Sequence, residues 1–262
     1  MTNEGLPVPT RGAGQRSGRT RRSLILIGVL CAALTAGATS VYLVVHNRPQ
    51  QLATLPQDAT GVVRVSGIPS TVSTPLASLM GLSPVPTRDA PNFTLVDQRG
   101  HSMSMASLKG RTVVLEFMDP NCVDICPLVS QEFVRAYQDL GSAASGVVFV
   151  AVNVNRHHLQ VADVAAFSRA HQLDALPSWH FLTGRLPSLQ KTWNSYAIVV
   201  SDAGPNADVV HTDTVFFIDP GGHERYVAAP AADYTASGTA YLPTADLASW
   251  GMGIALVARS LS

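Results

Sequence analysis

Two cysteines separated by three residues are the feature of this sequence best suited to chemistry. They are Cys122 and Cys126, and Pro127 follows directly. If the segment is helical, side chains four positions apart lie on one face, with Cα atoms roughly 6 Å apart. That spacing is compatible with a free dithiol, a disulfide or two metal ligands. The pattern alone leaves these three uses of the pair open.

The cysteine pair is expected at the junction of a strand and a helix. Residues 112–117 form a β-branched, strongly apolar run, which predicts a buried strand. Residues 128–140 then carry apolar side chains at helical spacing. Pro127 suits the first turn of that helix, where no backbone N–H is needed. Because the first turn of a helix favours negative charge, we expect both cysteine thiolates to be stabilised there.

Further strand and helix patterns alternate through the rest of the sequence. Short strand patterns flank a turn at Gly100, and a second buried strand is expected at 147–154. This alternation predicts an α/β fold with a partly parallel sheet. The predicted helices are 161–171, 188–196 and 244–261, and the later strands are 179–182, 213–218 and 223–228.

The N-terminal region predicts a membrane anchor. Residues 1–22 hold five arginines and one acid, and residues 23–45 hold no charged side chain. Crossing a bilayer core takes about 20 apolar residues. We therefore predict a cytoplasmic basic segment 1–22 and a transmembrane anchor 23–46, with the main domain outside the cytoplasm by the positive-inside rule. A cleaved signal peptide is the alternative, because 36–38 has the small-residue spacing of a cleavage site.

The composition of the rest of the chain indicates where the folded domain begins, and the net charge gives no support for a nucleic-acid partner. Residues 47–89 are rich in Pro, Ser and Thr, which predicts a linker, and residues 90–262 are predicted to form the folded domain. A chain of 262 residues with 46% hydrophobic residues can build one sizeable core. Its formal net charge of zero gives no reason to expect a nucleic-acid partner.

Four motifs then occur in a fixed order. They are the Cys-x-x-x-Cys-Pro segment at 122–127, Leu-Thr-Gly at 182–184, His211, and Ile-Asp-Pro-Gly-Gly at 218–222. Together they resemble the Sco/SenC family over roughly residues 88–229. The resemblance implies a thioredoxin-like fold, in which a central mixed sheet is flanked by helices. It also implies that Cys122, Cys126 and His211 bind a single copper ion as Cu(I) or Cu(II).

The resemblance further implies a partner and a compartment for that copper. Family members deliver copper to, or maintain the thiols of, the copper centre of cytochrome c oxidase. The implied partner is therefore the copper-receiving subunit of cytochrome c oxidase or another copper chaperone, beside the membrane that holds the N-terminal helix. Such a protein is a carrier rather than an enzyme with turnover.

Ligand chemistry favours copper independently of the resemblance. Soft thiolates select Cu(I), and adding an imidazole gives a site that can hold either oxidation state. Zinc competes for the same donors, but its structural sites are almost always four-coordinate and a fourth ligand is not evident. Asp124, between the cysteines, is expected either to favour the helix dipole or to act as an outer-shell metal contact. His157 and His158 could form a secondary metal pair, but we expect them to be solvated loop residues.

A second class of function stays open from the residues alone. The cysteine pair could serve a membrane-tethered thiol-disulfide oxidoreductase that uses no metal. Thioredoxin-like redox motifs carry two residues between the cysteines, whereas three intervene here. A histidine is unnecessary for thiol exchange but useful for a metal. These differences favour the copper carrier.

Overall fold

The computed structural model describes residues 66–202, 204 and 209–262. The chain divides into two compact units, residues 1–56 and 57–262, and the first unit lies entirely outside the described residues. The predicted basic segment 1–22 and anchor 23–46 therefore remain predictions. Within the described ranges, every helix is too short or too polar to cross a membrane.

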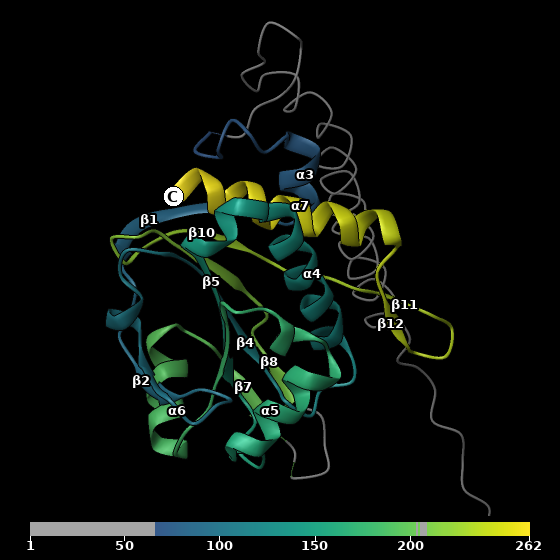
Figure 1. Ribbon diagram of the computed structural model, residues 1–262. Helices are drawn as coiled ribbons and strands as arrows, with labels where there is room; N and C mark the ends of the chain where they lie inside the picture. The colour runs from purple at the N-terminus through teal and green to yellow at the C-terminus, as the bar shows by residue number, and fades with distance from the viewer. Residues whose placement is uncertain (1–65, 203, 205–208) are drawn as a thin grey trace, which may run out of the picture. The chain divides into compact units, whose positions relative to one another are not determined.

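A six-stranded mixed sheet forms the centre of the described unit (Figure 1). The strand order is β1-β10-β9-β4-β5-β6, in which β4, β5 and β6 are parallel and the other neighbours pair antiparallel. A parallel β4-α4-β5 unit followed by the β9-β10 hairpin is a thioredoxin-like arrangement, so the predicted α/β class is confirmed. The strands are β1 (Ser83–Asp89), β4 (Thr112–Met118), β5 (Val147–Asn153), β6 (Trp179–Leu182), β9 (Val215–Ile218) and β10 (His223–Ala228).

Helices and short hairpins cover both faces of this sheet. Because successive residues of a strand point to opposite faces, Val114 and Met118 join one core, and Leu115 and Phe117 join another. The first core includes residues of α3 (Thr74–Leu79), α4 (Ile125–Leu140), α5 (Val161–Ala170) and α7 (Thr244–Leu261). The second includes residues of α6 (Leu186–Ser195) and of the hairpin β2 (Thr94–Val96) and β3 (Ser102–Ser104). Short 3₁₀ turns complete the unit at Met105–Leu108, Gly141–Gly146 and Leu173–Ala175.

Helix α7, yellow in Figure 1, packs closely on α4 and α3. A Cβ atom placed on Gly251 would overlap the side chain of Arg135, and one on Gly253 would overlap Met80. Arg259 of α7 also donates hydrogen bonds to the carbonyl oxygens of Asp139 and Leu140, at the end of α4. These contacts fix the C-terminal end of α4 against α7.

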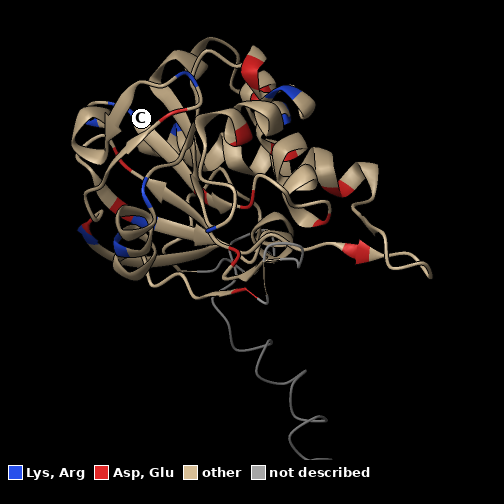
Figure 2. Cartoon of the chain, turned by 90° about the horizontal axis from the view of Figure 1, so that it is seen from below, with Lys and Arg blue, Asp and Glu red and all other residues tan. Residues whose placement is uncertain are grey.

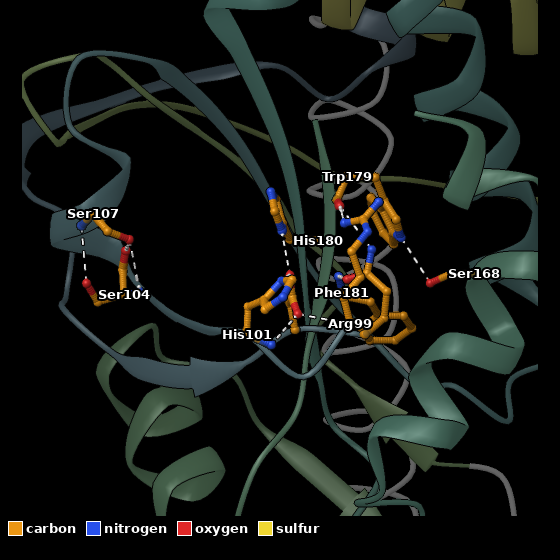
Figure 3. Close-up of polar contacts among 10 residues, drawn as sticks. Arg99, His101, Ser104, Ser107, Ser168, Trp179, His180 and Phe181 are labelled. Atoms are coloured by element: carbon orange, nitrogen blue, oxygen red, sulfur yellow. Dashed lines mark hydrogen bonds and ion pairs between the residues drawn. The ribbon is translucent and has the colours of Figure 1, made fainter. Parts of the chain in front are cut away.

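The two edge strands of the sheet are protected in different ways against pairing with a further strand. At β6, the Gln98 side chain donates to the Trp179 carbonyl oxygen at 3.0 Å and accepts from the Phe181 N–H at 2.9 Å. Arg99 donates to the same Trp179 oxygen at 3.1 Å (Figure 3). At the other edge, β1 contains Pro84 and Pro86, which have no N–H group to offer a further strand.

The structure corrects the predicted boundary between linker and domain. Residues 47–89 were expected to form a linker, yet α3 and β1 lie within this range, and β1 pairs with β10. The prolines of β1 gave the segment a linker-like composition. Since proline is tolerated in an edge strand, that composition did not exclude a strand. Ordered structure thus begins before residue 90.

Candidate metal and thiol site

Both cysteines are free thiols at the end of β4 and the start of α4. Helix α4 begins at Ile125, so Cys126 lies in its first turn and Cys122 in the preceding turn. The prediction that the two side chains stack on one helical face is therefore wrong for Cys122. A turn closed by Cys122 N–H to the Asp119 carbonyl oxygen, at 3.1 Å, precedes the helix instead. The two thiols are still close enough for each to shift the pKa of the other.

The two thiols of this pair differ in acidity. A hydrogen bond from Cys126, assisted by the backbone N–H groups of Asp124 and Cys126, lowers the pKa of Cys122. Donating that hydrogen bond, together with burial, raises the pKa of Cys126 well above its ordinary value. The expected thiolate stabilisation thus holds for Cys122 and fails for Cys126. Cys122 is the more readily ionised sulfur, and Cys126 retains its proton.

His211 lies at the end of β8 (Val209–His211), which forms a separate hairpin with β7 (Val200–Asp202). Together with Cys122 it lines a pocket of about 270 Å³, whose rim includes the exposed Val123 and Val210. The Nδ1 atom of His211 is 3.0 Å from the Thr212 carbonyl oxygen. Because a carbonyl only accepts, Nδ1 donates in this bond, and a neutral ring then keeps its lone pair on Nε2.

The predicted ligands share this region without forming a closed coordination site. In the part of the chain that is described, no three or more His, Cys, Asp or Glu side chains are grouped so that they could hold a metal ion. Cys122 and Cys126 are in contact, and His211 faces the pocket that Cys122 lines. The donor set of two sulfurs and one imidazole fits copper. Binding through all three would require them to draw closer together.

Asp124 occupies the N-cap position of α4 and lines the same pocket. Its carboxylate makes no capping hydrogen bond to the helix. Instead, its Oδ2 atom accepts from the hydroxyl of Tyr234 at 3.2 Å. Tyr234 belongs to the hairpin of β11 (Asp233–Tyr234) and β12 (Ala240–Tyr241), which projects beside α4 in Figure 1. The predicted place of Asp124 at the helix start is confirmed, and its partner was not anticipated.

Comparison with known proteins identifies the family. The SCO1/SenC family model matches residues 84–236, more than half of the chain. The chain belongs to the SCO1/SenC family. It is 26% identical over 226 residues to the human protein SCO2 homolog, mitochondrial, covering 82% of this chain and 73% of that one. It is 24% identical over 132 residues to the SCO1 protein homolog of Bacillus subtilis, covering 50% and 68% respectively.

Solved structures of Sco proteins share the fold of this SCO1/SenC chain. Bradyrhizobium japonicum ScoI with copper bound has a TM-score of 0.51 and 18% identity, covering 67% of this chain and 100% of that one. Apo Sco1 from Thermus thermophilus has a TM-score of 0.52 and 19% identity, covering 68% and 94%. At these identities the likeness establishes the thioredoxin-like fold.

Two buried acids and one half-buried acid next to the SCO1/SenC site were missed in the sequence. Glu116 on β4 is completely buried, Glu132 lies on the buried face of α4, and Asp213 lines the pocket. Burial, reinforced by the nearby Asp213 carboxylate, raises the pKa of Glu116 and of Glu132 well above the ordinary value. The Oε1 atom of Glu116 accepts from the Thr214 N–H at 3.3 Å. Glu116 therefore ties the strand before the cysteines to the segment after His211.

One signal in the sequence could have revealed this group. Glu116 is the single charged residue in the apolar run 112–117. A carboxyl group in a fully buried strand needs a partner or a proton, so its presence there points to a polar function behind the cysteines. The positions of Glu132 and Asp213 beside it depend on tertiary structure and carry no comparable local signal.

Several other histidines lie outside the pocket lining. His180 on β6 is 3.1 Å from Asp97, and the exposed His101 approaches the same carboxylate (Figure 3). His157 contacts Asp202 at 2.7 Å, whereas His158 lies 4.0 Å from Asp163. The two histidines of the candidate secondary metal pair thus have separate carboxylate partners. In Figure 2, acidic and basic residues occur side by side on several elements.

Proposed function

We propose that this SCO1/SenC protein binds one copper ion through Cys122, Cys126 and His211. The observation that carries the proposal is the shared pocket, which Cys122 and His211 line, with the Cys126 thiol close enough to shift the pKa of Cys122. Two thiolates satisfy Cu(I), and the imidazole adds a donor that Cu(II) prefers. The hydrogen bond from His211 Nδ1 to Thr212 supports Nε2 as the metal-binding atom.

We propose that the bound copper is cargo for cytochrome c oxidase. The family resemblance supports either delivery of copper to the oxidase copper centre or maintenance of that centre's thiols. The Bradyrhizobium ScoI structure, which contains copper, supports the same choice of metal. The partner would be the copper-receiving oxidase subunit or another copper chaperone.

Copper titration of the reduced protein under anaerobic conditions tests the proposed ligands. We expect one copper ion per chain, weaker binding of both oxidation states in Cys122→Ala and Cys126→Ala, and retention of some Cu(I) in His211→Ala. The electron paramagnetic resonance spectrum of Cu(II) should change most in His211→Ala, because Cu(II) favours nitrogen ligands. His101→Ala, an exposed histidine outside the pocket, is the matched control. An unchanged Cu(II) spectrum in His211→Ala would exclude His211 as a ligand.

We also propose that residues 23–46 anchor the protein, with the folded unit outside the cytoplasm. The five arginines before this uncharged segment support that orientation. A reporter that is active only outside the cytoplasm, fused after Ser262, should be active. The protein should remain with membranes after a carbonate wash. Release into the soluble fraction would support cleavage near Ala38 instead.

A metal-free thiol-disulfide oxidoreductase is the second candidate. The asymmetric acidity of Cys122 and Cys126 favours it, since a readily ionised thiol beside a protonated one suits disulfide exchange. Reduction of insulin by the reduced protein distinguishes the two candidates. We expect slow or absent turnover. Fast turnover that persists in His211→Ala and without copper would establish the oxidoreductase.

A further inference from the structure

The loop that follows β5 is bonded to the turn that carries Cys122. The side-chain amide of Asn155 donates to Oδ1 of Asp119 at 2.9 Å, and the Asn121 N–H donates to the same oxygen at 2.7 Å. The backbone carbonyl oxygen of Asp119 accepts from the Cys122 N–H, which closes the cysteine turn. Both Asp119 and Asn155 are buried. Asn155 therefore fixes the cysteine turn against the end of β5.

The next two residues of the same loop are bonded to the hairpin that carries His211. The Oδ2 atom of Asp202, on β7, lies 2.7 Å from Nε2 of His157 and 3.1 Å from Nε of Arg156. Because an ionised carboxylate only accepts, both side chains donate to it. Within the described ranges, no other side-chain hydrogen bond or ion pair joins β7 or β8 to another element.

The β7-β8 hairpin is otherwise attached weakly. Its two described strands pair with each other and not with the central sheet, whereas the cysteine turn follows β4 in the middle of that sheet. Val200 and Val209 are only partly buried against the second core, and Ser201 and Val210 are exposed. Elements with few buried contacts open locally at a low cost in free energy. The position of His211 therefore depends strongly on what holds this hairpin.

We propose that Asp202 is a positioning residue, whose bonds to Arg156 and His157 keep β8 beside the cysteine turn. Residues 155–157 hold that turn on one side and the hairpin on the other. A short piece of backbone thus limits the distance between His211 and the cysteines before any metal bond forms. The inference deepens the proposed function, because it rests on His211 as a copper ligand.

Competing chelators for each oxidation state of copper test this role through metal affinity. Asp202→Ala removes the shared acceptor and leaves the three proposed ligands in place. We expect the affinity for Cu(II) to fall roughly two- to tenfold, the factor that one net hydrogen bond contributes. The affinity for Cu(I) should stay nearly unchanged, since two thiolates satisfy that ion. Ser201→Ala, at an exposed position of the same strand, is the matched control and should change neither affinity.

Amide hydrogen exchange of the metal-free protein provides a second readout. Asp202→Ala should speed exchange of the β8 amides several-fold and leave those of β9 unchanged, because only the hairpin loses a contact. His157→Ala should give the same pattern to a smaller extent. The adjacent His158→Ala is its matched control, because His158 approaches Asp163 instead.

A double substitution separates positioning of His211 from general support of the site. In a His211→Ala background, adding Asp202→Ala should no longer change the affinity for Cu(II). An equal loss of Cu(II) affinity in that background, equal losses for Cu(I) and Cu(II), or unchanged β8 exchange would each overturn the proposal. An unchanged Cu(II) spectrum in His211→Ala alone would instead refute the proposed ligands, while the exchange rates would still report whether Asp202 holds β8.

Discussion

The two ends of helix α4 are held in different ways. At its C-terminal end, Gly251 of α7 allows close contact with Arg135, and Arg259 donates to the last carbonyl groups. At its N-terminal end, Val123 is 84% exposed and the cap side chain of Asp124 bonds outside the helix. Close packing against α7 holds the C-terminal end of α4, whereas the N-terminal end near the cysteines is held by polar contacts.

This difference separates stability from chemistry along a single helix. Contacts buried against α7 contribute to the free energy of unfolding of the whole unit, whereas exposed hydrogen bonds contribute little to it. The cysteine end can therefore exchange hydrogen-bond partners while the helix stays in place. Substitutions along α4 should therefore differ in their effect on the free energy of unfolding, and they follow from the largest expected effect to the smallest.

Gly251→Ala tests the packed end of α4. The added methyl group would overlap the Arg135 side chain and approach the Ala136 backbone, which forces α7 away from α4. Overpacking of this kind costs about 1–3 kcal/mol. Denaturant unfolding should report that loss. Gly146→Ala is the matched control, since a Cβ there meets nothing within 4 Å. Equal unfolding midpoints for the two variants would contradict the close packing.

Glu132→Gln tests the buried acid in the middle of α4. Burial raises the pKa of Glu132 above its ordinary value of 4.5, so the folded state keeps a proton that the unfolded state loses above that pH. Stability from this group is fully present below pH 4.5 and falls as the pH rises toward the folded-state pKa. The slope can reach about 1.4 kcal/mol per pH unit for one proton.

Unfolding free energies measured from pH 4 upward should therefore decline less steeply in Glu132→Gln than in the wild type. Asp174→Asn, at an exposed aspartate of the turn Leu173–Ala175, is the control and should follow the wild type. If the unfolding free energy of Glu132→Gln falls with pH as steeply as that of the wild type, Glu132 is ionised in the folded protein. Another group must then offset the cost of burying its charge.

Asp124→Ala tests the cysteine end and should have the smallest effect on stability. Loss of a working N-cap costs about 1 kcal/mol. Because Asp124 makes no capping bond, we expect a change within about 0.5 kcal/mol, typical of a surface substitution. The same unfolding assay applies. A loss of a full N-cap contribution would indicate that Asp124 caps α4 in solution, which would break the contrast between the two ends.

Local patterns in the sequence were sufficient for five of the six strands of the central sheet and for most of the helices. The buried strands β4, β5 and β6 stand out as short apolar runs, and the long α7 carries apolar residues at helical spacing. Proline misled the prediction at β1, because only the sheet topology reveals that this strand lies at an edge. Elements were thus predicted best where they are buried or long.

The site was predictable in its residues and less so in its geometry. Cys122, Cys126 and His211 could be selected from motif order, and whether all three bind metal stays a prediction. That Cys122 precedes the helix depends on a turn stabilised by Asp119, whose side chain accepts from Asn155 at 2.9 Å. The bond between Asp124 and Tyr234 joins residues 110 positions apart. No local pattern encodes contacts of that kind.

Protection of the two sheet edges limits how this protein can associate. Exposed edge strands can add a strand from another chain, which leads to aggregation. At β6, Gln98 takes the place of a neighbouring strand by pairing with both Trp179 and Phe181. At β1, Pro84 and Pro86 leave gaps in the row of donors. Neither edge of the central sheet therefore offers another chain a regular backbone to extend.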